Sequence, residues 1–172
     1  MKNNLLILGA GGHGHVVAEI ARSCGYTGQI AFLDDGQSGV DILGKCADFL
    51  SFTDRFPVMF PAIGSNAIRQ EWIRRLNEAG VTIPSLIHPT AYVSPRATVC
   101  SGVAILPRAI VNTGTVVGDG CIVNCGAIID HDCVLNEGVH VCLGAIIKAE
   151  NRIPAFEKIE AGVVIANRTY PL

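Results

Sequence analysis

The sequence predicts two domains of different fold class, an α/β domain with a parallel sheet over residues 1–84 and a parallel β-helix over residues 85–172. Three observations support this division. Strand-like and helix-like patterns alternate in the first half, and a glycine-rich loop follows its first strand. In the second half an aliphatic residue recurs at every sixth position.

The α/β domain is expected to begin with a short buried strand and an amphipathic helix. Leu5–Leu8 is an unbroken apolar run of strand length, and it ends in a glycine-rich loop over residues 9–14. A helical pattern follows, and Gly25 is placed to end it. The apolar face of this helix comprises Val16, Val17, Ile20, Ala21 and Cys24.

Two further strands and a second helix complete the predicted βαβαβ unit. We expect strands at Ile30–Leu33 and Val58–Ile63, and a helix that Ser65 caps and Gly80 ends. Because alternating strands and helices form parallel sheets with right-handed crossovers, this half-domain is predicted to be Rossmann-like. The apolar face of the second helix comprises Ile68, Trp72, Ile73 and Leu76.

The glycine-rich loop has the pattern of a nucleotide-binding turn. Gly9–Gly14 satisfies G-x-G-x-x-G between a strand and a helix, and Asp34–Asp35 closes the next strand about twenty residues later. Such a loop lets the backbone approach a pyrophosphate, which the helix N-terminus attracts. Only half of a dinucleotide domain precedes the β-helix, so the nucleoside diphosphate of an activated sugar is favoured over NAD. A tight turn without a ligand is the alternative.

The second half of the chain has a period of six residues, which neither an α-helix nor a flat sheet requires. Each hexad makes one short strand and one corner, and three hexads close one coil of about eighteen residues. We therefore predict a left-handed parallel β-helix of hexapeptide repeats. The aliphatic register comprises Ile87, Val93, Val99, Ile105, Val111, Val117, Val123, Ile129, Leu135, Val141, Ile147, Ile153, Ile159 and Ile165.

A second register follows each aliphatic residue by four positions and consists mostly of small residues. Asn151 and Glu157 interrupt it, and regularity returns at Val163, so a distorted penultimate coil is expected. Thr169–Leu172 is expected to fold over the open last coil, because unpaired strand edges need a cover. The small register comprises Ala91, Ala97, Val103, Ala109, Thr115, Cys121, Ala127, Cys133, Val139 and Ala145.

The composition excludes several classes of partner. The net charge of -2, without a basic run, does not support binding to nucleic acid or to an anionic membrane. No stretch reaches the ~18 apolar residues of a membrane span, and the N-terminal run of four is too short for a signal peptide. The seven cysteines form no CxxC pair, which indicates reduced, packed thiols in a cytoplasmic protein.

Two histidines of the β-helix are candidates for catalysis. His131 lies between Asp130 and Asp132 at a predicted corner, where a carboxylate would orient the ring and raise its basicity. His140 lies half a coil further on, so a site that uses both histidines requires two subunits of a trimer. A catalytic zinc site with three histidine ligands and an open position for water is not expected, because these coils supply only two histidines.

Taken together, the two halves resemble a known family, the bacterial hexapeptide-repeat sugar acyltransferases. These include the sialic acid O-acetyltransferases and the UDP-4-amino-sugar N-acetyltransferases of bacterial glycan biosynthesis. The matching stretches are Gly9–His15, Phe32–Asp35, Ala62–Arg69, Ile87–Pro89, Val123–Asn124, Asp130–Cys133 and His140–Val141.

The resemblance implies a role for each matched residue in the transfer of an acetyl group from acetyl-CoA to a nucleotide-activated amino sugar or a sialic acid. His131 would be the general base, supported by Asp132. His140 would contact the thioester across the interface of a homotrimer, and backbone amides near Gly144 would stabilise the oxyanion. No metal is implied. The residues matched to substrate binding are Gly11, Gly12, His13, Asp34, Asp35, Gly64 and Asn124.

Two questions stay open at the level of sequence. The resemblance covers amine and hydroxyl acceptors, and both UDP and CMP as the nucleotide. The alternative function is a non-catalytic trimeric scaffold that binds a nucleotide or sugar without coenzyme A. The irregular residues Asn151 and Glu157, in the few coils that follow His140, favour this alternative.

Overall fold

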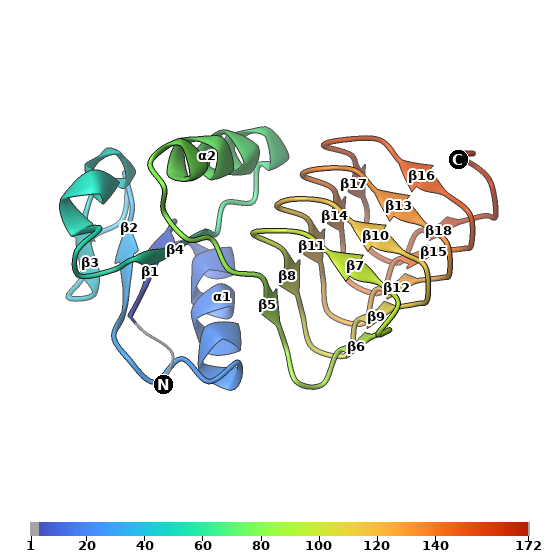
Figure 1. The fold of residues 1–172 in the computed structure, drawn as a ribbon, viewed down its shortest axis with the longest axis horizontal. Helices are drawn as coiled ribbons and strands as arrows, with labels where there is room; N and C mark the ends of the chain where they lie inside the picture. Colours follow the sequence, from blue (N-terminus) through green and yellow to red (C-terminus); the bar gives the residue numbers. More distant parts are fainter. Residues whose placement is uncertain (1–3, 172) are drawn as a thin grey trace. The chain divides into compact units, whose positions relative to one another are not determined.

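The computed structural model describes residues 4–171, and the chain divides into two units, Met1–Pro84 and Ser85–Leu172. The first unit is a four-stranded parallel sheet with two α-helices and a 3-10 helix. The second is a stack of short strands that form three parallel sheets (Figure 1).

The sheet of the first unit has the strand order β3-β2-β1-β4. The central strand β1 (Leu5–Leu8) pairs in parallel with β2 (Ile30–Leu33) on one side and β4 (Val58–Pro61) on the other. The helices of this unit are α1 (Gly12–Ser23), α2 (Asn66–Glu78) and the 3-10 helix η1 (Cys46–Phe52). The strands and helices expected from the sequence are confirmed, with β4 shorter than predicted.

The structure corrects the predicted face of α2. Ile68 is 52% exposed, whereas Arg69 is 1% exposed and takes its place against the sheet together with Trp72 and Leu76. The guanidinium of Arg69 is tolerated there because it donates to the Ile63 carbonyl and to the Asn66 side chain, each at 2.9 Å.

Two elements of the first unit were not predicted. The edge strand β3 (Ile42–Gly44) has three residues, and η1 follows it directly. Neither has the apolar periodicity of a longer element, although Cys46 and Phe49 of η1 are buried in the same core as α2. On α1, Val16 is exposed rather than part of the buried face.

The second unit is a left-handed parallel β-helix made of fourteen two-residue strands. Each strand ends at one residue of the predicted aliphatic register, and each pairs with the strand eighteen residues away, as in Val117↔Leu135. Figure 1 shows the coils stacked along the helix axis. The strands are β5 (Leu86–Ile87), β6 (Tyr92–Val93), β7 (Thr98–Val99), β8 (Ala104–Ile105), β9 (Ile110–Val111), β10 (Val116–Val117), β11 (Ile122–Val123), β12 (Ile128–Ile129), β13 (Val134–Leu135), β14 (His140–Val141), β15 (Ile146–Ile147), β16 (Arg152–Ile153), β17 (Lys158–Ile159) and β18 (Val164–Ile165).

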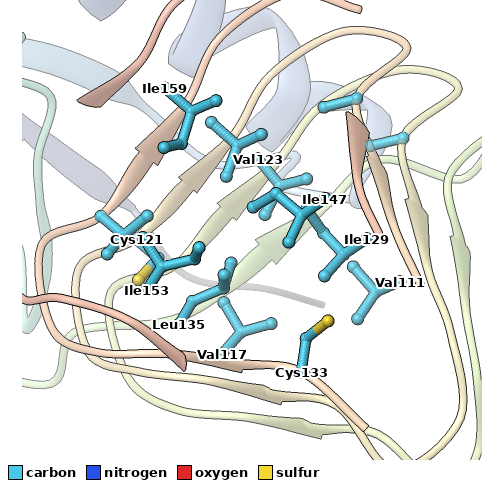
Figure 2. Packing of buried hydrophobic residues seen from close by; sticks show 14 of the residues in the cluster. Val111, Val117, Cys121, Val123, Ile129, Cys133, Leu135, Ile147, Ile153 and Ile159 are labelled. Atoms are coloured by element: carbon cyan, nitrogen blue, oxygen red, sulfur yellow. The ribbon is translucent and has the colours of Figure 1, made fainter. Parts of the chain in front are cut away.

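The aliphatic register fills the interior of the coils. Figure 2 shows side chains such as Val123, Ile129 and Leu135 converging from the three sheets toward the axis, with Cys121 and Cys133 among them. All five are fully buried. This continuous column of branched side chains is the core of the unit, and the charged residues lie on the corners and on the outer faces of the sheets.

Every sixth residue from 102 to 168 has a positive φ and therefore turns the chain at a corner. We call these twelve positions the corner register. Most are glycine, which adopts this conformation without steric cost, while Asp132 is among the exceptions. The non-glycine residues of the corner register are Arg108, Asp132, Glu150, Phe156 and Arg168.

Polar residues of the small register, and Ser85 and Asn151 at positions that continue it on either side, connect successive coils. Each donates a side-chain hydrogen bond to the carbonyl of the residue fifteen positions later. The pairs are Ser85 with Cys100, Thr115 with Asp130 at 2.8 Å, Cys121 with Asn136 at 3.1 Å, Cys133 with Lys148 at 3.2 Å, and Asn151 with Ala166 at 2.8 Å. These thiols are packed donors, and none of the seven cysteines, all of which lie within residues 4–171, forms a disulfide.

The expected distortion of the penultimate coil is wrong. β16, β17 and β18 pair in register with the preceding coils, because Asn151 replaces a small residue without leaving the core. Its Oδ1 accepts from the Tyr170 amide at 2.8 Å, and the Tyr170 carbonyl accepts from Arg152. The end of the chain thus closes onto the last coil as predicted, with Leu172 outside the described residues.

Candidate functional site

The glycine-rich loop lies at the carboxyl end of β1 and is shaped by two close contacts. A Cβ on Gly9 would lie 2.8 Å from the Ala62 carbonyl oxygen, and one on Gly14 would lie 2.0 Å from that of Gly9. By contrast, no atom lies within 4 Å of a Cβ built on Gly11 or Gly12. The loop is therefore packed tightly at its base and open at its tip, where a ligand could approach the backbone.

The open tip coincides with the N-terminus of α1. Gly11 is the N-cap without a side-chain cap, and the first turn carries no acidic residue. The amides of such a turn point outward and attract negative charge. His13 is half-buried within this turn, while the ring of His15 packs 5.2 Å from that of Phe32.

Gly64 belongs to the same edge of the sheet. It follows β4, which pairs with β1, and a Cβ on it would have no neighbour within 4 Å. The order in which strands are added to the sheet reverses at β1, since β2 lies on one side of it and β4 on the other. Open α/β sheets bind ligands at this point, and Gly11, Gly12 and Gly64 follow the ends of the two strands that pair there.

Asp34 ties the end of β2 to the glycine-rich loop. Its Oδ2 accepts from the Ala10 amide at 2.7 Å, and its Oδ1 accepts from the amides of Gly36 and Gln37. The hydrogen bond from Ala10 is the main reason that the pKa of Asp34 lies below its ordinary value. Sequence reasoning assigned this carboxylate to substrate, but the geometry uses both oxygens to hold backbone.

A hollow of about 460 Å³ lies beside Asp34 and Asp35. Asp35 is exposed, and its Oδ1 accepts from the Cys46 amide at 3.1 Å. The hollow is also lined by Ser38 and Lys45, which the sequence did not single out because they belong to the unpredicted segment around β3. Its volume falls in the range of small-molecule sites.

In the β-helix, His131 and Asp132 form a hydrogen-bonded pair at a corner. The corner follows β12, and His131 Nδ1 lies 2.8 Å from Asp132 Oδ2. This contact assigns the ring proton to Nδ1 and leaves the lone pair on Nε2, in a side chain that is 46% exposed. The pair has the chemistry of a general base held by a carboxylate.

The neighbourhood of the pair is negatively charged. The hydrogen bond to Asp132 is the main cause that raises the pKa of His131 above its ordinary value, and the charges of Asp130 and Glu150 act in the same direction. Glu150 itself is ion-paired with Arg168 one coil further on. These charges therefore make the neutral His131 ring a stronger base than an isolated imidazole.

Asn124 and His140 meet at a different corner. Asn124 Nδ2 lies 3.3 Å from His140 Nε2, and Asn124 Oδ1 accepts from the Cys125 amide at 2.8 Å. His140 belongs to β14, which pairs with β11 just before Asn124. The structure thus unites two predicted site residues that are sixteen positions apart in sequence.

The position of Gly144 corrects one expectation. Its amide donates to the Cys125 carbonyl at 3.0 Å, as part of the contact between coils, and is not available to an oxyanion. The residue itself is exposed, and a Cβ on it would have no neighbour within 4 Å. Gly144 therefore offers open surface next to Asn124 and His140 rather than a hydrogen-bond donor.

The two corners lie on either side of one apolar sheet. Strand β12 runs from the Asn124 corner to the His131 corner, and its sheet has the order β18-β15-β12-β9-β6. We call the outward-facing residues of this sheet the apolar ladder, in which each residue pairs with the next. It comprises Tyr92, Ile110, Ile128, Ile146 and Val164, all of them partly or fully exposed.

Two features are not found in the described part of the chain. Among residues 4–171, no three His, Cys, Asp or Glu side chains gather in a way that could hold a metal ion. Over the same residues, no helix combines the length and the apolar character that crossing a bilayer requires.

Comparison with known proteins relates each half of the chain to sugar acetyltransferases. The family model described as the PglD N-terminal domain matches residues 4–76. The acetyltransferase domain of PglB from Neisseria gonorrhoeae, solved in complex with acetyl coenzyme A, is 36% identical with a TM-score of 0.92. That match covers 98% of this chain and 84% of the PglB chain.

Two further relatives differ in the nucleotide that their descriptions name. UDP-N-acetylbacillosamine N-acetyltransferase of Bacillus subtilis is 31% identical over 110 residues, which are 60% of this chain. The match spans about half of that relative, 51% of its length. PerB from Caulobacter crescentus, solved with CoA and GDP-perosamine, is 27% identical with a TM-score of 0.55, over 96% of this chain and 93% of PerB.

Proposed function

This chain belongs to the bacterial hexapeptide-repeat sugar acyltransferases, and from this membership we propose that it transfers an acetyl group from acetyl-CoA to a nucleotide-linked amino sugar. The observation that carries the proposal is the His131–Asp132 pair on the β-helix. An amine acceptor on a UDP-sugar is supported by the Bacillus subtilis relative, which is named as an N-acetyltransferase of such a compound.

The nucleotide part of the substrate is assigned to the carboxyl edge of the sheet in the first unit. Gly11 and Gly12 leave the backbone open at the N-terminus of α1, which favours a diphosphate. Gly64 extends this open surface toward β4. Asp34 supports the site indirectly, by holding the glycine-rich loop, while the exposed Asp35 and the half-buried His13 are assigned to contact with the sugar nucleotide.

In the proposed mechanism, His131 acts as general base. Its Nε2 takes the proton from the acceptor amine as the nitrogen attacks the thioester carbonyl, and the thiolate of coenzyme A leaves when the tetrahedral intermediate collapses. Asp132 keeps Nδ1 protonated and stabilises the imidazolium that forms. Transfer is direct, so no covalent acyl-enzyme is required.

Coenzyme A is assigned to the second corner, where Asn124, His140 and the open surface at Gly144 lie together. We propose that His131 of one subunit and His140 of another complete one site in a homotrimer. The apolar ladder supports this arrangement, since its five aliphatic or aromatic side chains are partly or fully exposed in a row between the two corners. Seven cysteines without a disulfide among the described residues support a reducing compartment, the cytoplasm.

The test is an acetyl-transfer assay of the full chain with acetyl-CoA and a panel of UDP-amino sugars, CMP-sugars and free sialic acids. His131→Ala is expected to lose about 100-fold to 10,000-fold in kcat, the contribution typical of a general base. The matched control is His88→Ala, since His88 is also a histidine of the β-helix unit, but its ring bonds within its own turn, to Thr90.

Calorimetry with acetyl-CoA separates the proposal from a non-catalytic scaffold. An enzyme of this class binds the thioester, whereas a scaffold that has lost coenzyme A binding gives no heat at millimolar ligand. Binding of UDP-sugars without any binding of acetyl-CoA would therefore overturn the proposed activity. Transfer at the wild-type rate by His131→Ala would overturn the assignment of the base.

A further inference from the structure

We propose that Gly114 is a positioning residue for the His131–Asp132 pair, because its missing side chain leaves the space that the Asp132 carboxylate occupies. The inference rests on the proposed function, since it concerns the same general base. Gly114 lies one coil before Asp132, eighteen residues earlier in the corner register. No motif in the sequence distinguishes it from the other corner glycines.

The space above Gly114 is filled by one group. A Cβ on Gly114 would lie 2.2 Å from Asp132 Oδ1 and 3.2 Å from Asp132 Cγ. The other oxygen of the same carboxylate, Oδ2, is the one that bonds to His131 Nδ1 at 2.8 Å. The carboxylate is thus held between the glycine of the preceding coil and the imidazole.

The backbone of Asp132 cannot move away to relieve such a clash. Its amide donates to the Thr113 carbonyl at 2.9 Å, and the preceding Asp130 is bonded through its carbonyl to Thr115 Oγ1 at 2.8 Å. Only the side chain can rotate, and this costs little folding free energy because the clashing atoms are at its free end. Rotation would break the bond to His131 Nδ1 and release the ring.

Other corner glycines lack this contact and serve as controls. A Cβ placed on Gly126, Gly144 or Gly162 would have no atom within 4 Å. Gly162 matches Gly114 in backbone conformation, with φ of 71° against 70°. Alanine at either position therefore meets the same left-handed strain, and only alanine at Gly114 also meets a carboxylate.

The charges that face His131 come from its own turn and from the following coil. Its own turn contributes Asp130 and Asp132, and the following coil contributes Glu150, which is paired with Arg168. The preceding coil contributes only the uncharged stretch from residue 112 to residue 115. A change in the titration of His131 on substitution of Gly114 therefore reports movement of Asp132.

The experiment compares Gly114→Ala with Gly162→Ala by NMR titration of the His131 ring in the full chain, and by kcat and KM of acetyl transfer. Gly114→Ala is expected to lower the pKa of His131 and to reduce kcat on the order of 100-fold, with KM little changed. Gly162→Ala is expected to change neither. A His131 titration in Gly114→Ala that matches the unsubstituted chain would overturn the proposal.

A double-substitution cycle with Asp132→Gly tests whether Gly114 acts through Asp132. Once the carboxylate is gone, Gly114→Ala is expected to cause no further loss of kcat and no further change in the His131 titration. A further loss of kcat would mean a merely structural role. If Gly114→Ala alone does not fold, the double variant is expected to fold as Gly162→Ala does, and its failure to do so would overturn the proposal.

These readouts separate the inference from the proposed function. The NMR titration needs no substrate, so it tests the positioning of His131 even if no acetyl transfer is detected. Conversely, an active enzyme in which Gly114→Ala leaves the His131 titration unchanged would keep the proposed function and remove this inference.

Discussion

Replacing Asn151 by alanine should open the last coil of the β-helix. Asn151 is fully buried, and its Nδ2 donates to the carbonyls of Lys148 and Ala166, both at 2.8 Å. Its Oδ1 accepts from the Tyr170 amide at 2.8 Å. This one side chain therefore connects its own turn to Ala166 and Tyr170, and alanine would remove these three bonds together with a longer one to the Ala149 carbonyl at 3.4 Å.

The expected magnitude follows from these bonds. A buried hydrogen bond contributes about 1 kcal/mol net, so the three together give about 3 kcal/mol. The matched control is Asn136→Ala, because Asn136 is half-buried and makes one such bond, to the Ile153 carbonyl at 2.9 Å. About 1 kcal/mol is expected for the control.

Hydrogen exchange measured by mass spectrometry localises the effect to the last coil. A change of about 3 kcal/mol corresponds to exchange on the order of 100-fold faster for the amides of Arg152 and Tyr170, which bond within the closed end. The first unit should exchange as before. Exchange no faster than in Asn136→Ala would refute the reasoning that Asn151 holds the coil closed.

Three other substitutions test the site and the assembly. Asp132→Asn removes the main cause that raises the pKa of His131, so the acid limb of the pH–rate profile should move to lower pH; an unmoved limb would contradict the role of Asp132. The pKa of Asp34 is lower in the folded protein than in the unfolded chain, so its ionised carboxylate stabilises the fold. This stabilisation is fully present above the pKa of the unfolded chain and is lost as the pH falls through the pKa of the folded protein. In Asp34→Asn the melting temperature should therefore fall less steeply as the pH is lowered. An unchanged dependence on pH would contradict the stabilising role of the Asp34 carboxylate. Ile128→Glu places a charge on the apolar ladder and should dissociate the proposed trimer in light-scattering chromatography, whereas Arg152→Glu, on another sheet, should not.

The β-helix could be predicted almost completely because its period is visible as an aliphatic residue at every sixth position of the sequence. Each strand ends at a residue of the aliphatic register, so the positions of Ile87 to Ile165 determine all fourteen strands. The prediction at Asn151 is wrong because a polar residue in the small register does not by itself interrupt the coil. Its hydrogen bonds to the next coil show that polarity is compatible with this position when a carbonyl lies opposite.

The first unit was predicted less completely, for a different physical reason. Strand β1 and helix α1 have clear patterns, but β3 has three residues and pairs only through the tertiary fold. Similarly, the burial of Arg69 instead of Ile68 depends on the Ile63 carbonyl that receives its guanidinium. Helical periodicity contains no information about this acceptor, because Ile63 lies before the first residue of α2.

In the candidate site, too, some features could be predicted from local sequence and others depend on the tertiary fold. The turn Asp130–Asp132 could be identified from neighbours in sequence, because the carboxylate that bonds His131 is the next residue. Two other features depend on how adjacent coils stack. These are the contact between Asn124 and His140 and the space that Gly114 leaves for Asp132. The use of Asp34 for backbone amides likewise appears only once the loop and β2 are adjacent.

The pairing of each strand with the one eighteen residues away has a consequence for how this protein can change in length. Every hydrogen bond between coils joins nearest neighbours, so a whole coil could be inserted or deleted while all other bonds keep their partners. A gain or loss of one residue within a strand would instead turn the interior side chains outward for the rest of that coil. Length variation in this half is therefore expected in steps of one full coil, or as excursions confined to the corners.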